Sequence, residues 1–366
     1  MSNRRTFLGY GLGAIITGPL FASSQENKFE EAARILDRAS ASGQVRGAVL
    51  YVRDGKTIFT RPFGDAKSVD SAFLLGSISK PIVIAALMTL YEKSLFGLND
   101  PVKKFLPQFD GNGRERVTIK HLLTHTSGLP DQLPENARLR QSHAPLKDFV
   151  EGTFRLPLGF EPGTSYEYSS MGIMLAAEIA QHLSGTEIKQ FVDQSILKPL
   201  GMNHSALGVG KFQTGQTMPC QVEYAAIESG GGDPDSKLWD WNSNYWRELG
   251  APWGGVQASA PDVARFLDEF MKPFHSIFKP EVARLMTQNH NPPNLESRGL
   301  GFDSEMSASC KNCSPQTFGH TGSTGTIAWA DPVRDRVCVV LTTLPARAIT
   351  PHPRQLASDC ISMLPA

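Results

Sequence analysis

Segments typical of β-strands lie near both ends of this 366-residue chain, and segments typical of helices separate them. Residues 47–52 and 56–61 are joined at Asp54-Gly55, a pair that favours a hairpin turn. The later strand candidates are residues 300–302, 318–320, 326–330 and 336–342. Helical periodicity covers residues 29–41, 77–95, 119–123, 146–154, 172–183, 187–196 and 354–363. This order predicts an α+β fold: an antiparallel sheet flanked by helices, built from both chain ends, with an inserted mostly helical lobe.

The predicted lobes divide a single domain, residues 25–366. We expect the α/β part to comprise about residues 25–76 and 251–366, and the helical lobe to comprise about residues 77–202. The polar stretch 203–250 is interpreted as a long loop or a small subdomain. A cleft between two lobes is a preferred place for a small-molecule site, so we expect one there.

The charge balance argues against nucleic-acid binding. Lys plus Arg and Asp plus Glu number 36 each, so the formal net charge is zero. A nucleic-acid binder usually carries a basic excess on one face. The sequence contains no G-x-S-x-G elbow, H-E-x-x-H helix, P-loop or dinucleotide-binding glycine pattern. We therefore expect no nucleic-acid partner, no metal and no cofactor.

The first 24 residues have the order of an export signal. Arg4-Arg5 precede an apolar stretch at residues 7–21, and small residues follow it. The string Asn3-Arg4-Arg5-Thr6-Phe7-Leu8 also resembles a twin-arginine signal. An uncleaved membrane anchor is the alternative, although the stretch is short for a span and is interrupted by glycines and a proline. Either interpretation predicts a protein that works in the periplasm or outside the cell.

Five cysteines suit an oxidising compartment but do not define a disulfide framework. Cys310-Lys311-Asn312-Cys313 is a lone C-x-x-C, which disfavours zinc binding and leaves a local disulfide as the alternative. Cys338 lies in a candidate buried strand, so we expect it to pack in the core.

The tetrad Ser77-Ile78-Ser79-Lys80 places a hydroxyl and an amine one helical turn apart, before a long apolar stretch. Residues three apart on a helix share a face, so Lys80 is expected within reach of the Ser77 oxygen. A serine hydroxyl becomes an effective nucleophile when a neighbouring base takes its proton. Two more tetrads, Ser195-Ile196-Leu197-Lys198 and Ser276-Ile277-Phe278-Lys279, have the same pattern, so the tetrad alone does not identify a nucleophile.

Two further patterns follow the first tetrad. Pro162-Gly163-Thr164-Ser165-Tyr166-Glu167-Tyr168-Ser169-Ser170 ends a loop before a helical segment, and Phe318-Gly319-His320-Thr321-Gly322-Ser323 lies among the late strands. With Ser-x-x-Lys, Tyr-x-Ser and His-Thr-Gly in this order, the chain resembles the serine β-lactamase and penicillin-binding-protein superfamily. It is most similar to the branch that holds class C β-lactamases, D-alanyl-D-alanine carboxypeptidases, D-aminopeptidases and related esterases.

Four more phrases carry the resemblance, which runs from about residue 30 to the C-terminus. They are Leu98-Asn99-Asp100-Pro101-Val102, His121-Leu122-Leu123-Thr124-His125-Thr126-Ser127-Gly128-Leu129-Pro130, Pro199-Leu200-Gly201-Met202 and Gly254-Gly255-Val256-Gln257-Ala258-Ser259. They favour Ser77 as the nucleophile, because Ser195 falls where the family has a structural helix end. Ser276 has no long helix to support it.

The resemblance implies that Ser77 attacks a carbonyl group and forms an acyl-enzyme. Lys80 and Tyr168 are the implied general bases, and the sequence does not decide which of them takes the serine proton. Tyr166 is a nearby alternative to Tyr168. The backbone amides of Ser77 and Ser323 are expected to form the oxyanion hole.

The implied substrate-binding residues are Ser170, His320, Thr321 and Gly322, and two of them depart from the family pattern. Ser170 stands where the family usually has Asn, and His320 where β-lactamases and carboxypeptidases usually have Lys. A lysine there helps hold the carboxylate of the substrate, whereas His is mostly neutral near pH 7. The resemblance therefore implies a small ester or peptide/amide substrate, and an esterase, a D-peptidase or a weak β-lactamase.

Other polar and aromatic residues have two interpretations. His121 and His125 are expected to satisfy backbone groups rather than to act in catalysis. Trp253 is expected either to line the cleft or to pack beside it. The aromatic residues of the 203–250 stretch could form a substrate wall or, as we favour, the core of that stretch: Trp239, Trp241, Tyr245 and Trp246.

The alternative function is a catalytically inert member of the superfamily that binds cell-wall peptides or a partner protein. The sequence leaves the oligomeric state open.

Overall fold

The computed structural model describes residues 27–213, 215–271, 276–306 and 309–365. The predicted export signal, residues 1–24, lies outside these ranges. Within them, no helix combines the length and the apolar character needed to cross a bilayer.

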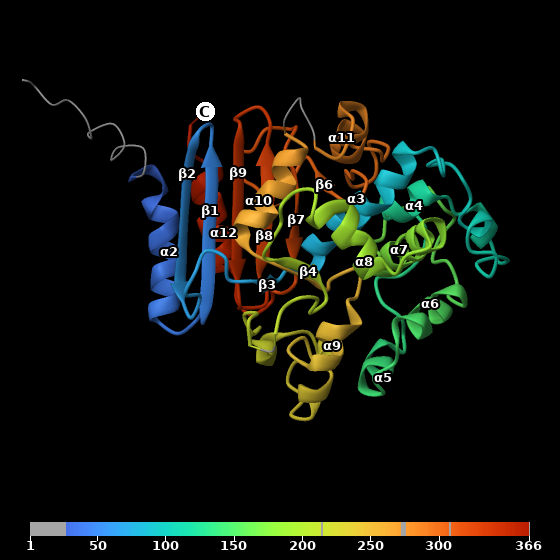
Figure 1. Cartoon of the computed structure of the whole chain (residues 1–366), viewed down its shortest axis with the longest axis horizontal. Coiled ribbons are helices and arrows are strands. Elements are labelled where there is room, and N and C mark those ends of the chain that lie inside the picture. Colours follow the sequence, from blue (N-terminus) through green and yellow to red (C-terminus); the bar gives the residue numbers. More distant parts are fainter. Residues whose placement is uncertain (1–26, 214, 272–275, 307–308, 366) are drawn as a thin grey trace, which may run out of the picture.

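Both chain ends build one six-stranded antiparallel sheet, which confirms the predicted α+β architecture (Figure 1). Its order is β2-β1-β9-β8-β7-β6. The strands are β1 (Gly47–Asp54), β2 (Thr57–Gly64), β6 (Asp303–Ser304), β7 (Phe318–Gly322), β8 (Thr326–Asp331) and β9 (Arg336–Thr342). The predicted hairpin joins β1 to β2, with Asp54 opposite Thr57 and Gly55 in the left-handed conformation that the turn requires (φ +57°). β1 then pairs with β9, so the N-terminal hairpin continues the C-terminal strands.

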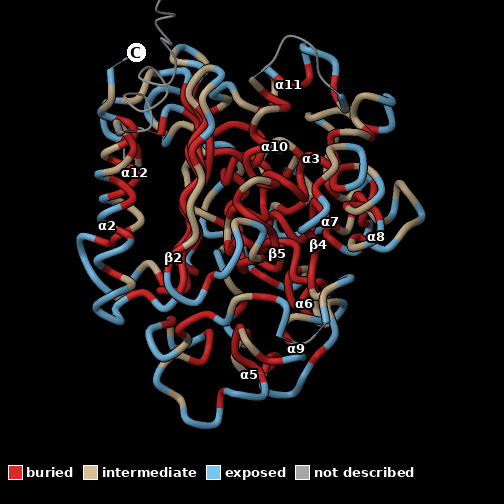
Figure 2. The backbone as a smooth tube through the Cα atoms, turned by 60° about the vertical axis from the view of Figure 1, so that its left-hand side comes forward, coloured by how far each residue is buried: buried red, intermediate tan, exposed pale blue. Residues whose placement is uncertain are grey.

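Helices cover both faces of this sheet. α2 (Glu30–Ala41) and α12 (Pro353–Ser362) pack side by side on one face, and α10 (Ala260–Glu269) packs on the other (Figure 2). Leu36, Trp329 and Ile361 belong to the apolar cluster under α2 and α12. The indole Nε1 of Trp329 donates a hydrogen bond to the Ser358 hydroxyl at 2.8 Å, which ties β8 to α12.

The middle of the chain forms a mostly helical part beside the sheet (Figure 1). Its helices are α3 (Ser79–Glu92), α4 (Ile119–Leu123), α5 (Asn136–Gln141), α6 (Leu146–Phe154), α7 (Ser170–Ser184) and α8 (Ile188–Val192). Two further helices are α9 (Asn244–Leu249) and α11 (Pro280–Thr287). α3 is apolar on nearly every side, and α7 packs along it. A helix of that kind has to be buried all round, so α3 forms the centre of the molecule.

One strand prediction is misplaced, because β6 begins at Asp303, just after the predicted residues 300–302, and the three strands of a second sheet were not predicted. Residues 300–302 form a bend, because Gly301 has a φ of +84° and its amide bonds to the Leu123 carbonyl instead of a neighbouring strand. Phe302 is buried by packing against other aromatic rings. The unpredicted strands form a second sheet in the order β3-β5-β4: β3 (Phe73–Leu74), β4 (Ser205–Leu207) and β5 (Val256–Ala258). Two or three residues are too few to show a period of two.

Three cysteines belong to the two patterns noted in the sequence, for which the disulfide pairing was left open. Cys310 and Cys313 form a disulfide bond within their loop. Cys338 is fully buried in β9, which confirms its place in the core.

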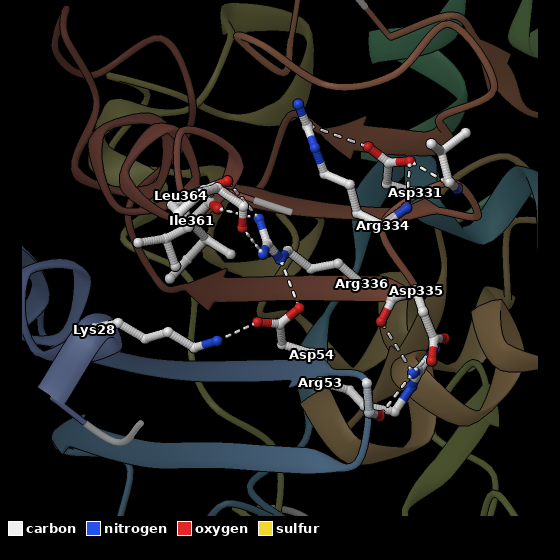
Figure 3. A network of polar contacts seen from close by, with 12 residues as sticks. Lys28, Arg53, Asp54, Asp331, Arg334, Asp335, Arg336, Ile361 and Leu364 are labelled. Carbon is white, nitrogen blue, oxygen red and sulfur yellow. Dashed lines mark hydrogen bonds and ion pairs between the residues drawn. The ribbon is translucent and has the colours of Figure 1, made fainter. Parts of the chain in front are cut away.

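A buried ion network closes one end of the main sheet (Figure 3). Arg336 is 1% exposed; its Nε donates to Asp54 at 3.1 Å, and its Nη1 donates to the carbonyls of Ile361 and Leu364 at 3.2 and 3.0 Å. Burial alone raises the pKa of Asp54, but hydrogen bonds from Lys28 and Arg336 outweigh burial and hold the pKa below its ordinary value. The network joins β1, β9 and the C-terminal helix.

Replacing Arg336 by Met is expected to lower the free energy of unfolding by about 3 kcal/mol, because Asp54 loses one of its two cationic partners and the buried carbonyls lose their donor. Urea unfolding at pH 7 measures this change. The matched control is Arg34→Met, which removes an exposed arginine paired with Glu31 and should change stability by less than about 0.5 kcal/mol. Equal effects of the two substitutions would contradict the assigned role of the network.

Candidate active site

Ser77 lies on a 3-10 turn, Gly76–Ile78, that leads into α3. Gly76 has a φ of +57°, and a Cβ atom there would lie 2.9 Å from the Thr324 hydroxyl. The turn therefore requires glycine. Thr324 in turn donates a hydrogen bond to the Leu74 carbonyl at 2.7 Å, so the start of α3 is held against the end of β7. Ser77 is partly exposed there, in the wall of a cavity.

Lys80 lies one turn further along α3 and is 1% exposed. Its Nζ lies 2.9 Å from Ser77 Oγ and 2.9 Å from the Trp253 carbonyl oxygen. Burial lowers the pKa of Lys80 to about 7, Asp131 acts to raise this pKa, and Arg298 acts to lower it further. A substantial fraction of Lys80 is therefore a neutral amine near pH 7, beside the Ser77 hydroxyl.

The second serine of the tetrad has a structural role. Ser79 is fully buried, and its hydroxyl accepts a hydrogen bond from the Val256 amide at 3.0 Å. This bond attaches β5 to α3. The Trp253 carbonyl that binds Lys80 lies three residues before Val256, so Ser79 helps to position that carbonyl.

Tyr168 lies beside the Ser77–Lys80 pair. Lys80 Nζ is 4.7 Å from the centre of the Tyr168 ring, and Tyr168 and Ser77 line the same cavity, where Ser77 acts to lower the pKa of the Tyr168 hydroxyl. Burial raises the pKa of Tyr168 well above its ordinary value, so the phenol is protonated at pH 7. The Tyr166 hydroxyl instead accepts a hydrogen bond from Arg298 at 3.0 Å. The structure therefore places Tyr168, rather than Tyr166, next to Ser77.

The two histidines of the 121–130 phrase satisfy backbone groups, as expected. His121 Nδ1 accepts a hydrogen bond from the Thr118 amide at 3.2 Å, which caps α4. His125 Nδ1 accepts one from the Ser169 amide at 3.1 Å. The His125 ring also packs against the Tyr168 ring, with 4.6 Å between centres, and so supports the orientation of Tyr168.

Asp131 is a site residue that the sequence interpretation missed. Its Oδ1 accepts hydrogen bonds from the Ser170 hydroxyl at 2.6 Å and from the Ser170 amide at 3.0 Å. Ser170 is buried and lines the cavity, whereas Asp131 is exposed at the cavity. Asp131 directly follows Pro130, so its place next to a recognised phrase was the available signal.

His320 on β7 is buried and neutral. Burial lowers its pKa well below the ordinary value, and the charges of Arg298 and Lys80 act in the same direction. Its Nδ1 donates to the Thr321 carbonyl at 2.7 Å, and its Nε2 lies 3.5 Å from Asp303 Oδ1. His320 thus does not supply the permanent cation that a lysine would.

Arg298 is a second missed residue, and it carries the permanent charge in this region. Its side chain is 6% exposed and forms an ion pair with Asp303. Its guanidinium lies 5.4 Å from the Tyr168 ring centre and 5.6 Å from the Tyr166 ring centre. Arg298 lies in an irregular loop without a recognisable motif, so the sequence contained no signal for it.

The edge of β7 comes close to Ser77. A Cβ atom on Gly322 would lie 2.2 Å from the Leu75 carbonyl oxygen, so only glycine permits this approach. The Ser323 amide nitrogen lies 3.2 Å from the position of a Cβ on Gly76, the neighbour of Ser77. The two expected oxyanion amides, those of Ser77 and Ser323, therefore belong to backbone segments in contact. Thr321 is a partly buried residue of β7, next to Gly322.

A cavity of about 240 Å³ contains Ser77, Tyr168, Ser170 and Ser323 in its wall. The cavity is not lined by the last three residues of β7, which directly precede Ser323: His320, Thr321 and Gly322. Three tryptophans also line the cavity: Trp241, Trp246 and Trp253. They are buried and Trp246 packs against Trp253, so they form part of the core and the cavity wall at once. For Trp241 and Trp246, the interpretation favoured from the sequence, a role in the core of the 203–250 stretch alone, was therefore incomplete.

The other two tetrads lie outside this cavity. Ser195 is part of a π-helical turn, Asp193–Leu197, and its hydroxyl donates to the Phe191 carbonyl at 2.6 Å. Lys198 forms an exposed ion pair with Asp193. Ser276 precedes α11, and its amide donates to Glu269.

The comparisons with known proteins agree with this arrangement. The family model described as Beta-lactamase matches residues 32–356. Penicillin-binding protein 4* of Bacillus subtilis (strain 168) is 33% identical over 192 residues, which are 50% of this chain and 42% of that protein. An Escherichia coli (strain K12) protein with the provisional name D-alanyl-D-alanine carboxypeptidase is 25% identical over 346 residues, covering 81% of this chain and 78% of that protein.

A solved structure has the same fold. EstCE1, described as a hydrolase with promiscuous acyltransferase activity, superposes with a TM-score of 0.75 at 19% identity, covering 93% of this chain and 100% of that chain. The family model spans most of the chain, and the Ser-x-x-Lys, Tyr-x-Ser and His-Thr-Gly elements meet in space. The chain therefore belongs to the Beta-lactamase family, whose members are hydrolases of the serine β-lactamase and penicillin-binding-protein type.

Proposed function

We propose that the protein is an exported serine hydrolase that forms an acyl-enzyme on Ser77 and cleaves esters or small amides. The observation that carries this proposal is the 2.9 Å contact between Ser77 Oγ and Lys80 Nζ, with Lys80 buried and its pKa lowered to about 7. An amine that is neutral near pH 7 and hydrogen-bonded to a serine can activate that serine as a nucleophile.

In the acylation step, neutral Lys80 takes the proton of Ser77 while Oγ forms a bond to the substrate carbonyl carbon. The raised pKa of Tyr168 and the lowered pKa of Lys80 favour Lys80 as the base in the free enzyme. The developing oxyanion accepts hydrogen bonds from the amides of Ser77 and Ser323. The tetrahedral intermediate then expels the alcohol or amine, which receives the proton.

In deacylation, water attacks the acyl carbon and Ser77 Oγ leaves. The Tyr168 hydroxyl faces Ser77, and it can pass the proton of the attacking water to the site bases or to Ser77. Ser170, held by Asp131, offers a hydroxyl in the same cavity for the substrate. His320, Thr321 and Gly322 support the strand edge from which Ser323 acts.

The neutral state of His320 supports an ester or amide substrate over a β-lactam. The family's lysine at this position holds a carboxylate close to β7, and a buried neutral histidine does not replace that charge. Weak β-lactamase activity and D-peptidase activity remain part of the proposal. The name of the Escherichia coli relative, a carboxypeptidase, supports the peptide substrate.

Export is part of the same proposal. The order of charged, apolar and small residues in segment 1–24 supports a periplasmic or extracellular location. We assign residues 25–366 to one catalytic domain, with about 25–76 and 251–366 as its α/β part, about 77–202 as its helical lobe and 203–250 as a subdomain beside the cavity.

Ser77→Ala is expected to abolish labelling by a serine-directed phosphonate and to lower the turnover of p-nitrophenyl acetate by at least about 10³-fold, because the nucleophile is lost. Mass spectrometry of the labelled protein identifies the modified serine. The matched control is Ser195→Ala, which changes another Ser-x-x-K tetrad and should leave both readouts as in the wild type. A label on another serine, or turnover that survives Ser77→Ala, would contradict the mechanism.

The wild-type protein should hydrolyse the p-nitrophenyl ester faster than a chromogenic cephalosporin, because His320 provides no fixed cation on β7, where the family's lysine holds the carboxylate of a β-lactam. A D-alanyl anilide tests the peptidase activity in the same assay. A folded protein with neither label nor turnover would favour the alternative function, an inert module that binds cell-wall peptides or a partner protein.

The pH dependence of kcat/KM should report the protonation of Lys80. Lys80 acts when neutral, so kcat/KM should fall as the pH drops below about 7. Arg298 lowers the pKa of Lys80 and Asp131 raises it. Arg298→Gln should therefore raise this pKa, move the acid limb to higher pH and lower kcat/KM at pH 6.5 by about threefold. Steady-state rates between pH 5 and 9 measure the shift.

Arg298→Lys keeps the positive charge and should leave the acid limb close to that of the wild type. A loss of activity that is uniform across the pH range in Arg298→Gln would indicate that Arg298 acts only by packing.

A further inference from the structure

A second group of polar side chains lines the cavity of Ser77. Asn136 and Arg140 come from α5, and Ser229 ends the 3-10 turn Ile227–Ser229. All three are buried, with exposed fractions of 4%, 2% and 7%. The mechanism proposed above uses none of them. They form a buried polar wall in a cavity that is also lined by tryptophans, by the proposed catalytic residues and by more exposed charged residues.

The hydrogen bonds within this polar wall are long. Arg140 donates to the Glu228 carbonyl at 3.2 Å, to the Trp239 carbonyl at 3.2 Å and to Ser229 Oγ at 3.4 Å. Asn136 Nδ2 donates to the Glu228 carbonyl at 3.5 Å. Typical N–H···O distances are about 2.9–3.0 Å. Arg140 Nε is buried and has no acceptor among the described residues. The wall therefore keeps donor capacity that the protein does not use.

The charge of Arg140 is also uncompensated at short range. Among the described residues, no carboxylate lies within 4.0 Å of its guanidinium. Burial lowers the pKa of Arg140 to about 10, and the more distant Tyr245, Asp240 and Glu228 act to raise it. The guanidinium remains charged at neutral pH. A buried cation without a paired anion is unfavourable, and an anion bound in the cavity would relieve that cost.

The guanidinium is held in one orientation by aromatic rings. Its central carbon lies 4.1 Å from the Trp246 ring centre and 5.6 Å from the Trp239 ring centre. A planar donor group fixed in this way suits the planar acceptor of a carboxylate. The acidic residues that line the cavity, Asp131 and Glu228, are both exposed, so the buried wall itself is cationic.

We propose that Arg140, assisted by Asn136, forms a subsite for a carboxylate group of the substrate. This proposal rests on the proposed function, because it concerns the same cavity. The enzyme would then prefer esters or amides in which a carboxylate accompanies the scissile carbonyl group. His320 on β7 provides no positive charge, and Arg140 on α5 provides one in the cavity of Ser77. Arg140 binds and orients the substrate and takes no part in proton transfer.

The test compares two substrates that differ only in charge: mono-p-nitrophenyl glutarate and the corresponding p-nitrophenyl glutaramate. The wild-type enzyme should have a kcat/KM at least about tenfold higher for the carboxylate, the effect of one charge-assisted hydrogen bond. Arg140→Met should remove this preference and leave the kcat/KM for the glutaramate within about threefold of the wild-type value. Arg140→Lys should retain part of the preference. Arg138→Met, which removes an exposed arginine from the same helix, should retain all of it.

A binding measurement tests the subsite without turnover. Benzoate should bind the wild-type protein more tightly than benzamide in calorimetry, and Arg140→Met should abolish the difference. Equal binding of the two probes, or no preference for the charged ester in the wild type, would overturn the subsite. A preference that is lost in Arg347→Met and kept in Arg140→Met would also overturn it, because Arg347 is the exposed arginine at the same cavity. If Arg140→Met lowers kcat/KM for both substrates equally, Arg140 has a structural role instead.

The two proposals fail differently. If the wild type hydrolyses p-nitrophenyl acetate without preferring carboxylates, the subsite fails and the proposed function stands. If no ester is hydrolysed but benzoate binding depends on Arg140, the proposed function fails and the subsite stands.

Discussion

The buried amine of Lys80 is the interaction on which the rest of the site depends. Its two partners come from different parts of the chain: Ser77 from the start of α3, and the Trp253 carbonyl from the segment before β5. Ser79 holds that segment by its bond to the Val256 amide. An ammonium group in this place would pay a large desolvation cost, so the fold itself favours the neutral amine that a base requires. The packing that buries Lys80 is thus also the cause of its lowered pKa.

The neighbouring charges adjust this site from outside the motifs. Arg298 acts to lower the pKa of Lys80 and of His320, and Asp131 acts to raise that of Lys80. Asp303 forms an ion pair with Arg298 and lies 3.5 Å from His320 Nε2. The departure from the family pattern at β7 is therefore not a simple loss of charge. A neutral histidine occupies the strand, and arginines supply the permanent cations nearby: Arg298, Arg140 on α5 and the exposed Arg347.

Much of the fold was predictable because long elements show their periodicity locally. The N-terminal hairpin, strands β7 to β9 and helix α3 were recognised from hydrophobic pattern and turn residues. Residues 300–302 were mistaken for a strand because an apolar segment can be buried by aromatic packing as well as by strand pairing, and Gly301 bends the backbone there. The short sheet β3-β5-β4 was missed because its strands have no measurable period.

By itself, the sequence indicated which residues we propose as catalytic, because Ser77 and Lys80 lie one helical turn apart and the Tyr168 and His320 motifs are also local. It did not determine their surroundings. Arg298, Asp131 and Arg140 have no motif, and they reach the site because separate loops and a short helix fold around the start of α3. The tertiary structure decided the protonation of Lys80 as well, since the pKa of an amine depends on burial and on charges brought near by folding.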